Sequence, residues 1–373
     1  MTPLLDFPAE LLEMVADECC PEDLLLLRLT CSVLYTTSQR AVCREFFATK
    51  SFILACPQSM TALVAIAKHK HFGSSMKSIR LLAQMVPHAG LDYHRRVFER
   101  GSRSAQRDRN QREQHREERR KHSQLHDTQT AFWRQHGWSP CITEALRHLG
   151  TAPGSSKIAL YIGPADSATE GASGRQRLQG ALGYLRCLEN VEFAAEQSVE
   201  IMRAVTAAAC SVVDLTCSDS MWASYPSIPL SNSPNVPLLF GPEVYRQLHS
   251  AKILLSTNTG VEPETVQRLS SFLAGKQSLT HLALSAKGSY DGVDVFAMLA
   301  AIVHLPVITT LTLDEMTVHL VDLETFCKTH RRTLRTVIVH DSIYNDVELE
   351  ALQHLKEQLA QENPRITLEL NKE

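Results

Sequence analysis

The stretches LTHLAL (Leu279–Leu284) and ITTLTL (Ile308–Leu313) share one pattern, with apolar residues at the first, fourth and sixth positions. The alternation at the end of each stretch predicts a β-strand with one buried face. Related copies recur along the chain, and from residue 188 onward their starts are 24 to 36 residues apart. These copies are MKSIRL (76–81), LENVEF (188–193), VVDLTC (212–217), LHSAKI (248–253), LRTVIV (334–339), a weaker SSKIAL (155–160) and a final RITLEL (365–370).

The segments between the copies have helical periodicity. In PETVQRLSSFLAG, the apolar residues Val266, Leu269 and Leu273 recur at steps of three and four, and Gly275 supplies a stop signal. Alternating strands and helices predict an α/β fold in which parallel strands carry helices on one side. Each unit has an apolar flank that only its neighbour can cover, so we expect a solenoid. A plain α/β sheet domain is the alternative.

The N-terminal residues predict three short helices. Pro8 and Glu10 favour a helix start, and Pro21-Glu22-Asp23 repeats this signal. A third helix is expected from about Ser32 to Phe47. The second helix carries leucine around most of its circumference, which a module of about forty residues cannot bury by itself. We therefore expect this module to be covered either by the rest of the chain or by another protein.

The stretch LLDFPAELLEMVADECCPEDLLLLRLTCSVLYTTSQRAVCREFF (4–47) resembles an F-box. The matching features are the proline-x-Glu opening, the apolar helix, the proline-acidic-leucine start of the second helix and RLTCSVL. Many F-boxes carry Trp where this chain has Leu34. The resemblance implies docking onto the Skp-type adaptor of a cullin-containing ubiquitin ligase. The adaptor contacts that it implies are Phe7, Pro8, Leu11, Leu12, Leu24, Leu25, Leu27 and Leu34.

The whole architecture, an F-box at 1–47 followed by degenerate leucine-rich repeats at 48–373, resembles F-box proteins encoded in filamentous-fungal genomes. The resemblance implies a substrate receptor that binds the adaptor through the F-box and a target protein through the repeats. The competing interpretation is an interaction scaffold outside any ligase, whose N-terminal helices only cap the solenoid.

Two segments interrupt the repeats. A basic insert at about 94–136 has Ala105 as its only apolar residue between Gly101 and Ser123, so we expect a solvated helix or a disordered segment. A nuclear-localisation signal and nucleic-acid binding are its alternatives, but interspersed carboxylates and the lack of aromatic residues disfavour the second. The other segment is a proline-rich loop at about 218–243, which we expect either to cover an edge or to flank a binding surface.

The sequence contains no catalytic, cofactor or metal motif that we recognise. Phosphate-binding glycine loops, G-x-S-x-G and H-E-x-x-H are all missing, and the ten cysteines form no C-x-x-C pair. We therefore expect a non-enzymatic protein with no cofactor. The sequence shows neither a secretory signal nor an apolar run long enough for a membrane span, which predicts a cytoplasmic or nuclear protein.

The strand pattern also predicts a target-binding face. Side chains alternate along a strand, so the residue between the last two apolar positions of each copy should lie on the open face of the sheet. These candidate target contacts are Arg80, Glu192, Thr216, Lys252, Ala283, Thr312 and Ile338.

Overall fold

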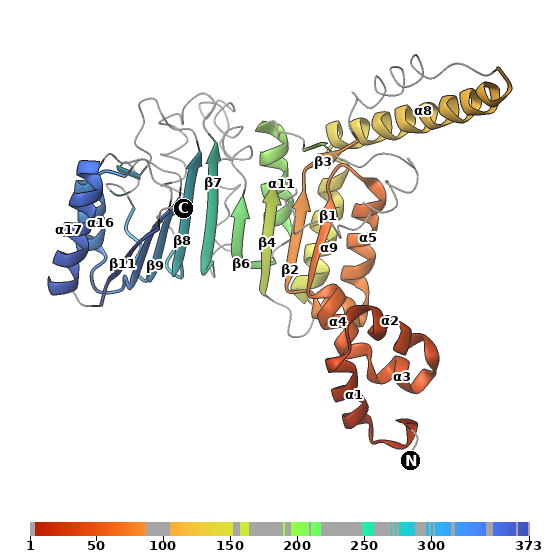
Figure 1. Cartoon of the computed structure of the whole chain (residues 1–373), viewed down its shortest axis with the longest axis horizontal. Coiled ribbons are helices and arrows are strands. Elements are labelled where there is room, and N and C mark those ends of the chain that lie inside the picture. The colour runs from red at the N-terminus through yellow and green to blue at the C-terminus, as the bar shows by residue number, and fades with distance from the viewer. Residues whose placement is uncertain are drawn as a thin grey trace.

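A computed structural model gives the fold of the chain (Figure 1). It describes residues 4–86, 105–151, 157–163, 189–190, 195–208, 210–217, 248–256, 270, 273, 276–287, 296–297, 300, 303–314, 318–340, 346–362 and 365–371.

The fold is α/β, as expected, and its centre is a nine-stranded parallel sheet. Neighbouring strands in the sheet follow one another along the chain, apart from the short β3 and β5. Such an order, with each strand added to the same edge, is compatible with a solenoid-like arrangement. The strands are β1 (Thr49–Ile53), β2 (Ser78–Leu82), β4 (Lys157–Gly163), β6 (Ser211–Cys217), β7 (Ser250–Ser256), β8 (His281–Lys287), β9 (Thr310–Asp314), β10 (Thr336–His340) and β11 (Thr367–Asn371).

Most of the repeated copies coincide with these strands, but the copy at 188–193 does not. Within it, Glu189–Asn190 form β5, which pairs antiparallel with β3 (Gln84–Met85) outside the main sheet. The weaker copy at 155–160 supplies β4 instead. The sequence pattern also missed β1. Three apolar positions in six residues are too little information to separate a buried strand from other apolar segments.

The strand register aligns the apolar positions of successive copies. Leu284 lies opposite Leu313, which lies opposite Val339, and all three are buried. Their neighbours on the same face join one core cluster with buried residues of the helices. Each fully buried side chain of this size contributes roughly 1.5–3 kcal/mol. The helices that contribute are α5 (Pro57–Lys68), α9 (Trp138–Thr151), α11 (Ala195–Ala207), α16 (Leu320–Thr329) and α17 (Asp346–Glu362).

The N-terminal module contains more elements than the three helices expected. After a short 3-10 turn at Leu4–Asp6 come α1 (Ala9–Glu18), α2 (Pro21–Thr30), α3 (Ser32–Thr37) and α4 (Gln39–Phe47). The third predicted helix is thus divided at Ser38, whose buried hydroxyl donates a 2.5 Å hydrogen bond to the Leu34 carbonyl. Hydroxyls that bond to nearby carbonyls compete with the helical pattern, which explains the break in this threonine- and serine-containing run.

The basic insert contains a long helix, α8 (Ala105–Arg134), which extends away from the sheet. Figure 1 shows this helix and the N-terminal module near opposite ends of the strands. Trp133 at the end of α8 and Trp138 at the start of α9 are buried, and their ring centres lie 6.0 Å apart, which anchors the turn between the two helices. The 218–243 loop lies outside the described residues.

The buried His330 joins α16 to the segment before β9. Its Nδ1 donates to the Phe326 carbonyl at 3.0 Å, and its Nε2 accepts from the Leu305 amide at 3.1 Å. This second bond requires a neutral ring. Burial lowers the pKa of His330 below its usual value. The stability that the neutral ring contributes is therefore present above a pH of about 6.5 and is lost as the pH falls through this value toward the lowered pKa.

We expect His330→Gln to reduce the loss of stability between about pH 7.5 and pH 5.5, since glutamine does not titrate in this range. Urea unfolding at both pH values measures the change. His148→Gln, at an exposed position of α9, is the control and should keep the wild-type pH dependence. An identical pH dependence in wild type and His330→Gln would contradict this role.

Candidate functional site

The N-terminal module carries an unusual concentration of exposed apolar side chains. Of the thirteen large hydrophobic residues that are exposed within the described part of the chain, eleven lie between residues 4 and 35. We call these eleven the apolar surface. They are Leu4, Leu5, Phe7, Leu11, Met14, Val15, Leu25, Leu26, Leu29, Val33 and Tyr35.

Helix geometry explains this exposure. The module has its own small core, built from Ala16, Leu24, Ala41 and Val42 with a few partly buried neighbours. Leu24 of α2 thus points inward and Leu27 packs partly against this core, while Leu25, Leu26 and Leu29 face solvent. Leu29 is 81% exposed and Leu26 is 63% exposed. Exposed leucines at this density are typical of surfaces that another protein covers.

The residues implied as adaptor contacts divide into two groups. Phe7, Pro8, Leu11 and Leu25 are exposed and lie on or beside the apolar surface, and Leu27 is partly buried. The structure places the remaining three, Leu12, Leu24 and Leu34, in the interior of the module.

Sequence reasoning missed several residues of the apolar surface. Met14 and Val15 follow Leu11 at steps of three and four, and Leu29 follows Leu25 and Leu26 in the same way. Helical spacing could have grouped them with the predicted contacts. It could not have decided which side of each helix faces the core, because leucine occupies both sides of α2.

The module is attached to the sheet through α4 and α6 (Lys70–Ser75). The rings of Phe47 and Phe72 stack with centres 4.0 Å apart, and His69 stacks against Phe72 at 3.9 Å. The Cys43 thiol donates to the His71 carbonyl at 3.6 Å. The apolar surface belongs to the elements before α4, so this attachment leaves it uncovered (Figure 1).

A hollow of about 620 Å³ lies beside this attachment. Polar side chains from α1, α3, α4 and α6 line it, among them Glu13, Arg40 and His71. Within the described residues, no three His, Cys, Asp or Glu side chains come together in a way that could hold a metal ion. Burial raises the pKa of the Cys210 thiol to about 11 and that of Cys327 to about 12, which keeps both thiols protonated and unreactive.

The open face of the sheet carries the predicted target contacts in one row. The register continues without a break from Arg80 through the strands to Ile338, and these side chains are partly buried or exposed. Glu192 lies outside the described residues, and Tyr161 occupies the position between Arg80 and Thr216. The row is Arg80, Tyr161, Thr216, Lys252, Ala283, Thr312 and Ile338.

Two residues of this row are held together. The Arg80 guanidinium carbon lies 4.6 Å from the centre of the Tyr161 ring, a cation–π contact. Tyr161 also packs against a small cluster at the ends of β1 and β2, to which Leu125 of α8 belongs as well. The second half of α8 therefore rests beside the open face of the sheet.

Side chains of α8 bind the backbone that follows β2. Gln129 accepts a 2.8 Å hydrogen bond from the Val86 amide, and His126 donates one of 2.8 Å to the Val86 carbonyl. His122, Gln129 and Trp133 are buried, which anchors this half of the helix. The described side chains before His122 are exposed or only partly buried.

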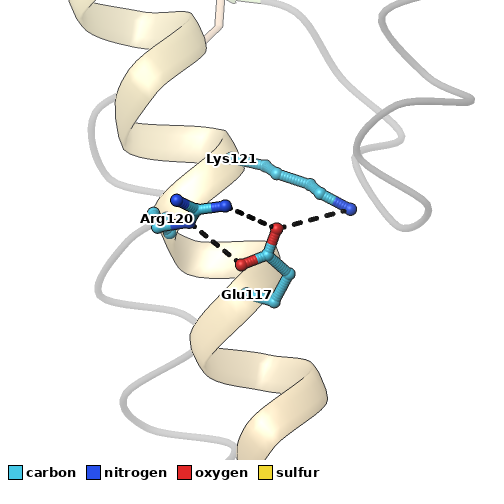
Figure 2. A network of polar contacts seen from close by, with 3 residues as sticks. All are labelled: Glu117, Arg120 and Lys121. Atoms are coloured by element: carbon cyan, nitrogen blue, oxygen red, sulfur yellow. Dashed lines mark hydrogen bonds and ion pairs between the residues drawn. The ribbon is translucent and has the colours of Figure 1, made fainter.

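The exposed half of α8 is supported by ion pairs along the helix (Figure 2). Arg120 donates two hydrogen bonds to the Glu117 carboxylate, at 2.9 and 3.0 Å, and Lys121 lies 3.8 Å from the same carboxylate. These hydrogen bonds, together with the nearby positive charges, lower the pKa of Glu117. Pairs at steps of three and four help an isolated helix to persist in water.

A scan of the chain against models of known protein families found no match, and neither did a search of curated proteins. Within the described residues, no helix has both the length and the apolar character required to cross a membrane.

We expect Gln129→Leu to loosen the contact between α8 and the sheet, because the buried Val86 amide loses its acceptor at a cost of about 1–3 kcal/mol. Hydrogen exchange in a peptide covering residues 84–86 should become about tenfold faster or more. Gln124→Leu, at an exposed position of the same helix, is the matched control. Unchanged exchange in Gln129→Leu would show that this hydrogen bond does not hold α8.

Proposed function

We propose that this chain is the substrate-recognition subunit of a Skp–cullin–F-box ubiquitin ligase, an F-box protein with degenerate leucine-rich repeats. The observation that carries the proposal is the apolar surface on the module that resembles an F-box. An adaptor that buries Leu25, Leu26 and Leu29 would remove from water the side chains that the module cannot cover itself. A few such residues usually provide most of the free energy of an interface.

The apolar surface argues against the alternative function, in which the N-terminal helices only cap the solenoid. A cap would turn its apolar side toward the sheet. Here α4 contacts β1, and α6 packs against α4, α5 and α9, while Leu26 and Leu29 of α2 are exposed.

In the proposed function the chain performs no covalent chemistry. The module holds the chain on the adaptor, and through it on a cullin, while the open face of the sheet holds a target protein. Such tethering raises the effective concentration of the target near the ubiquitin donor. Parallel strand–helix units support a rigid connection between the two surfaces, and a cytoplasmic or nuclear location accords with this activity.

We expect the double variant Leu26→Asp, Leu29→Asp to weaken adaptor binding by about 100-fold or more, because two apolar anchors are replaced by charges. Both positions are exposed, so the module should still fold. Co-purification and titration with a Skp-type adaptor measure the effect. Val321→Asp, at an apolar position of α16 that is 70% exposed, should leave adaptor binding unchanged. Failure of the wild-type chain to bind the adaptor would refute the proposed function.

A second double variant tests the open face of the sheet. Ala283→Arg with Thr312→Arg places two long charged side chains at neighbouring positions of the row. We expect proteins captured by the adaptor-bound wild type to fall by about tenfold or more, since the inserted side chains obstruct the face. Adaptor binding should remain, and quantitative mass spectrometry of captured proteins measures both. An unchanged set of captured proteins would remove this row from the target-binding surface.

A further inference from the structure

The exposed half of α8 is a charged arm whose role the adaptor contact does not explain. Residues 94–124 contain eleven Arg or Lys and five Asp or Glu, whereas the rest of the chain contains 27 and 36. This segment is therefore the basic part of an otherwise acidic protein. Seven of these basic residues and four of the acidic ones lie within α8, whose residues 105–121 span about 25 Å at 1.5 Å per residue.

The basic positions of α8 follow the helical repeat. Positions 109, 112, 116 and 120 are all arginine and lie at steps of three and four, which places them along one line of the helix. Arg116, Arg120 and the adjacent Lys121 are exposed. Glu117 engages Arg120 and Lys121, but the structure shows no ion pair of Arg116 with a described residue.

A shallow, open depression lies along this side of the helix. Arg116 and Arg120 form its basic end, and hydroxyl and amide groups together with the carboxylate of Asp127 continue it toward the sheet. Guanidinium groups bind carboxylates in pairs of parallel hydrogen bonds, and hydroxyl and amide groups can complete such a contact. The residues that line the depression are Arg116, Arg120, Ser123, Gln124, Asp127 and Thr128.

We propose that the exposed half of α8 binds an acidic polypeptide segment, which belongs to the target protein. Charge complementarity carries the choice of partner, because a segment rich in Asp and Glu fits a basic arm on an acidic protein. Since the partner is taken to be the target, this inference deepens the proposed function and rests on it. The arm and the module lie near opposite ends of the strands, so the two partners do not compete for space (Figure 1).

A protein partner fits this arm better than a nucleic acid does. Glu113, Glu117 and Asp127 are interspersed among the basic residues, and each would repel a continuous phosphate backbone. The helix has no aromatic residue before Phe132 on which bases could stack. An acidic polypeptide can place its carboxylates beside the arginines and its neutral residues beside the glutamates.

The test measures, by anisotropy, binding of the full chain to a fluorescent peptide of about 20 residues in which Glu alternates with Gly and Ser. Arg116→Glu with Lys121→Glu should weaken binding by about tenfold or more. Glu113→Lys should strengthen it severalfold, a gain that partial unfolding cannot imitate. Arg203→Glu reverses one charge at an exposed position of α11 and should have little effect. Circular dichroism of each variant checks that α8 remains helical.

Three results would overturn the inference. The wild-type chain could fail to bind the acidic peptide, the double variant could bind as tightly as Arg203→Glu, or a single-stranded RNA of equal length could bind more tightly than the peptide. The assay contains no adaptor, so its outcome is independent of adaptor binding. Adaptor co-purification with the double variant should remain at the wild-type level, which separates a failure of the arm from a failure of the proposed function.

Discussion

The arrangement of this protein depends on the limited capacity of a small helical module to bury apolar surface. About forty residues form one compact core, and that core accommodates Leu24 and part of Leu27 but not Leu25, Leu26 and Leu29 of α2. Within the described residues, large exposed hydrophobic side chains are concentrated on this module. These exposed side chains are not part of the module's core, so we interpret them as a contact surface for a partner.

The sheet, in contrast to the module, has its apolar surface covered by other residues of the same chain. Each strand–helix unit has an apolar flank, and the next unit along the chain covers it. Side chains such as Leu284 and Leu313 therefore continue one ladder through a single core cluster. This internal repetition leaves one face of the sheet to the helices and the other to solvent or ligands. The module joins this body through stacked rings at Phe47 and Phe72, so its own orientation is fixed by packing.

Part of the fold and of the candidate site could be predicted from the sequence. Alternation at Leu282–Leu284 and its equivalents predicted the strands and the row on their open face, because the period of two is a local property. Tyr161 belongs to that row because the copy at 155–160, and not the copy at 188–193, forms a strand of the main sheet. Packing between distant segments decides which copy does so. The inward side of α2 could not be predicted for the same reason. The resemblance to an F-box included Leu12, Leu24 and Leu34 among the adaptor contacts, and the structure buries all three in the module.

The long basic helix illustrates a further limit. Composition predicted a solvated segment, but the hydrogen bonds from Gln129 and His126 to Val86 depend on tertiary contacts. Those bonds explain why the helix leaves the sheet at a defined place. The first half of the helix extends away from the sheet, and its described side chains are exposed or only partly buried (Figure 1).

Hydrogen exchange of the full chain, measured alone and with a saturating Skp-type adaptor, tests the central claim most directly. The account predicts that peptides from residues 4–35 become protected on mixing, while those of the sheet core keep their rates. If these N-terminal peptides exchanged equally fast with and without the adaptor, the apolar surface would not be its docking site, and the assignment to a ubiquitin ligase would be wrong.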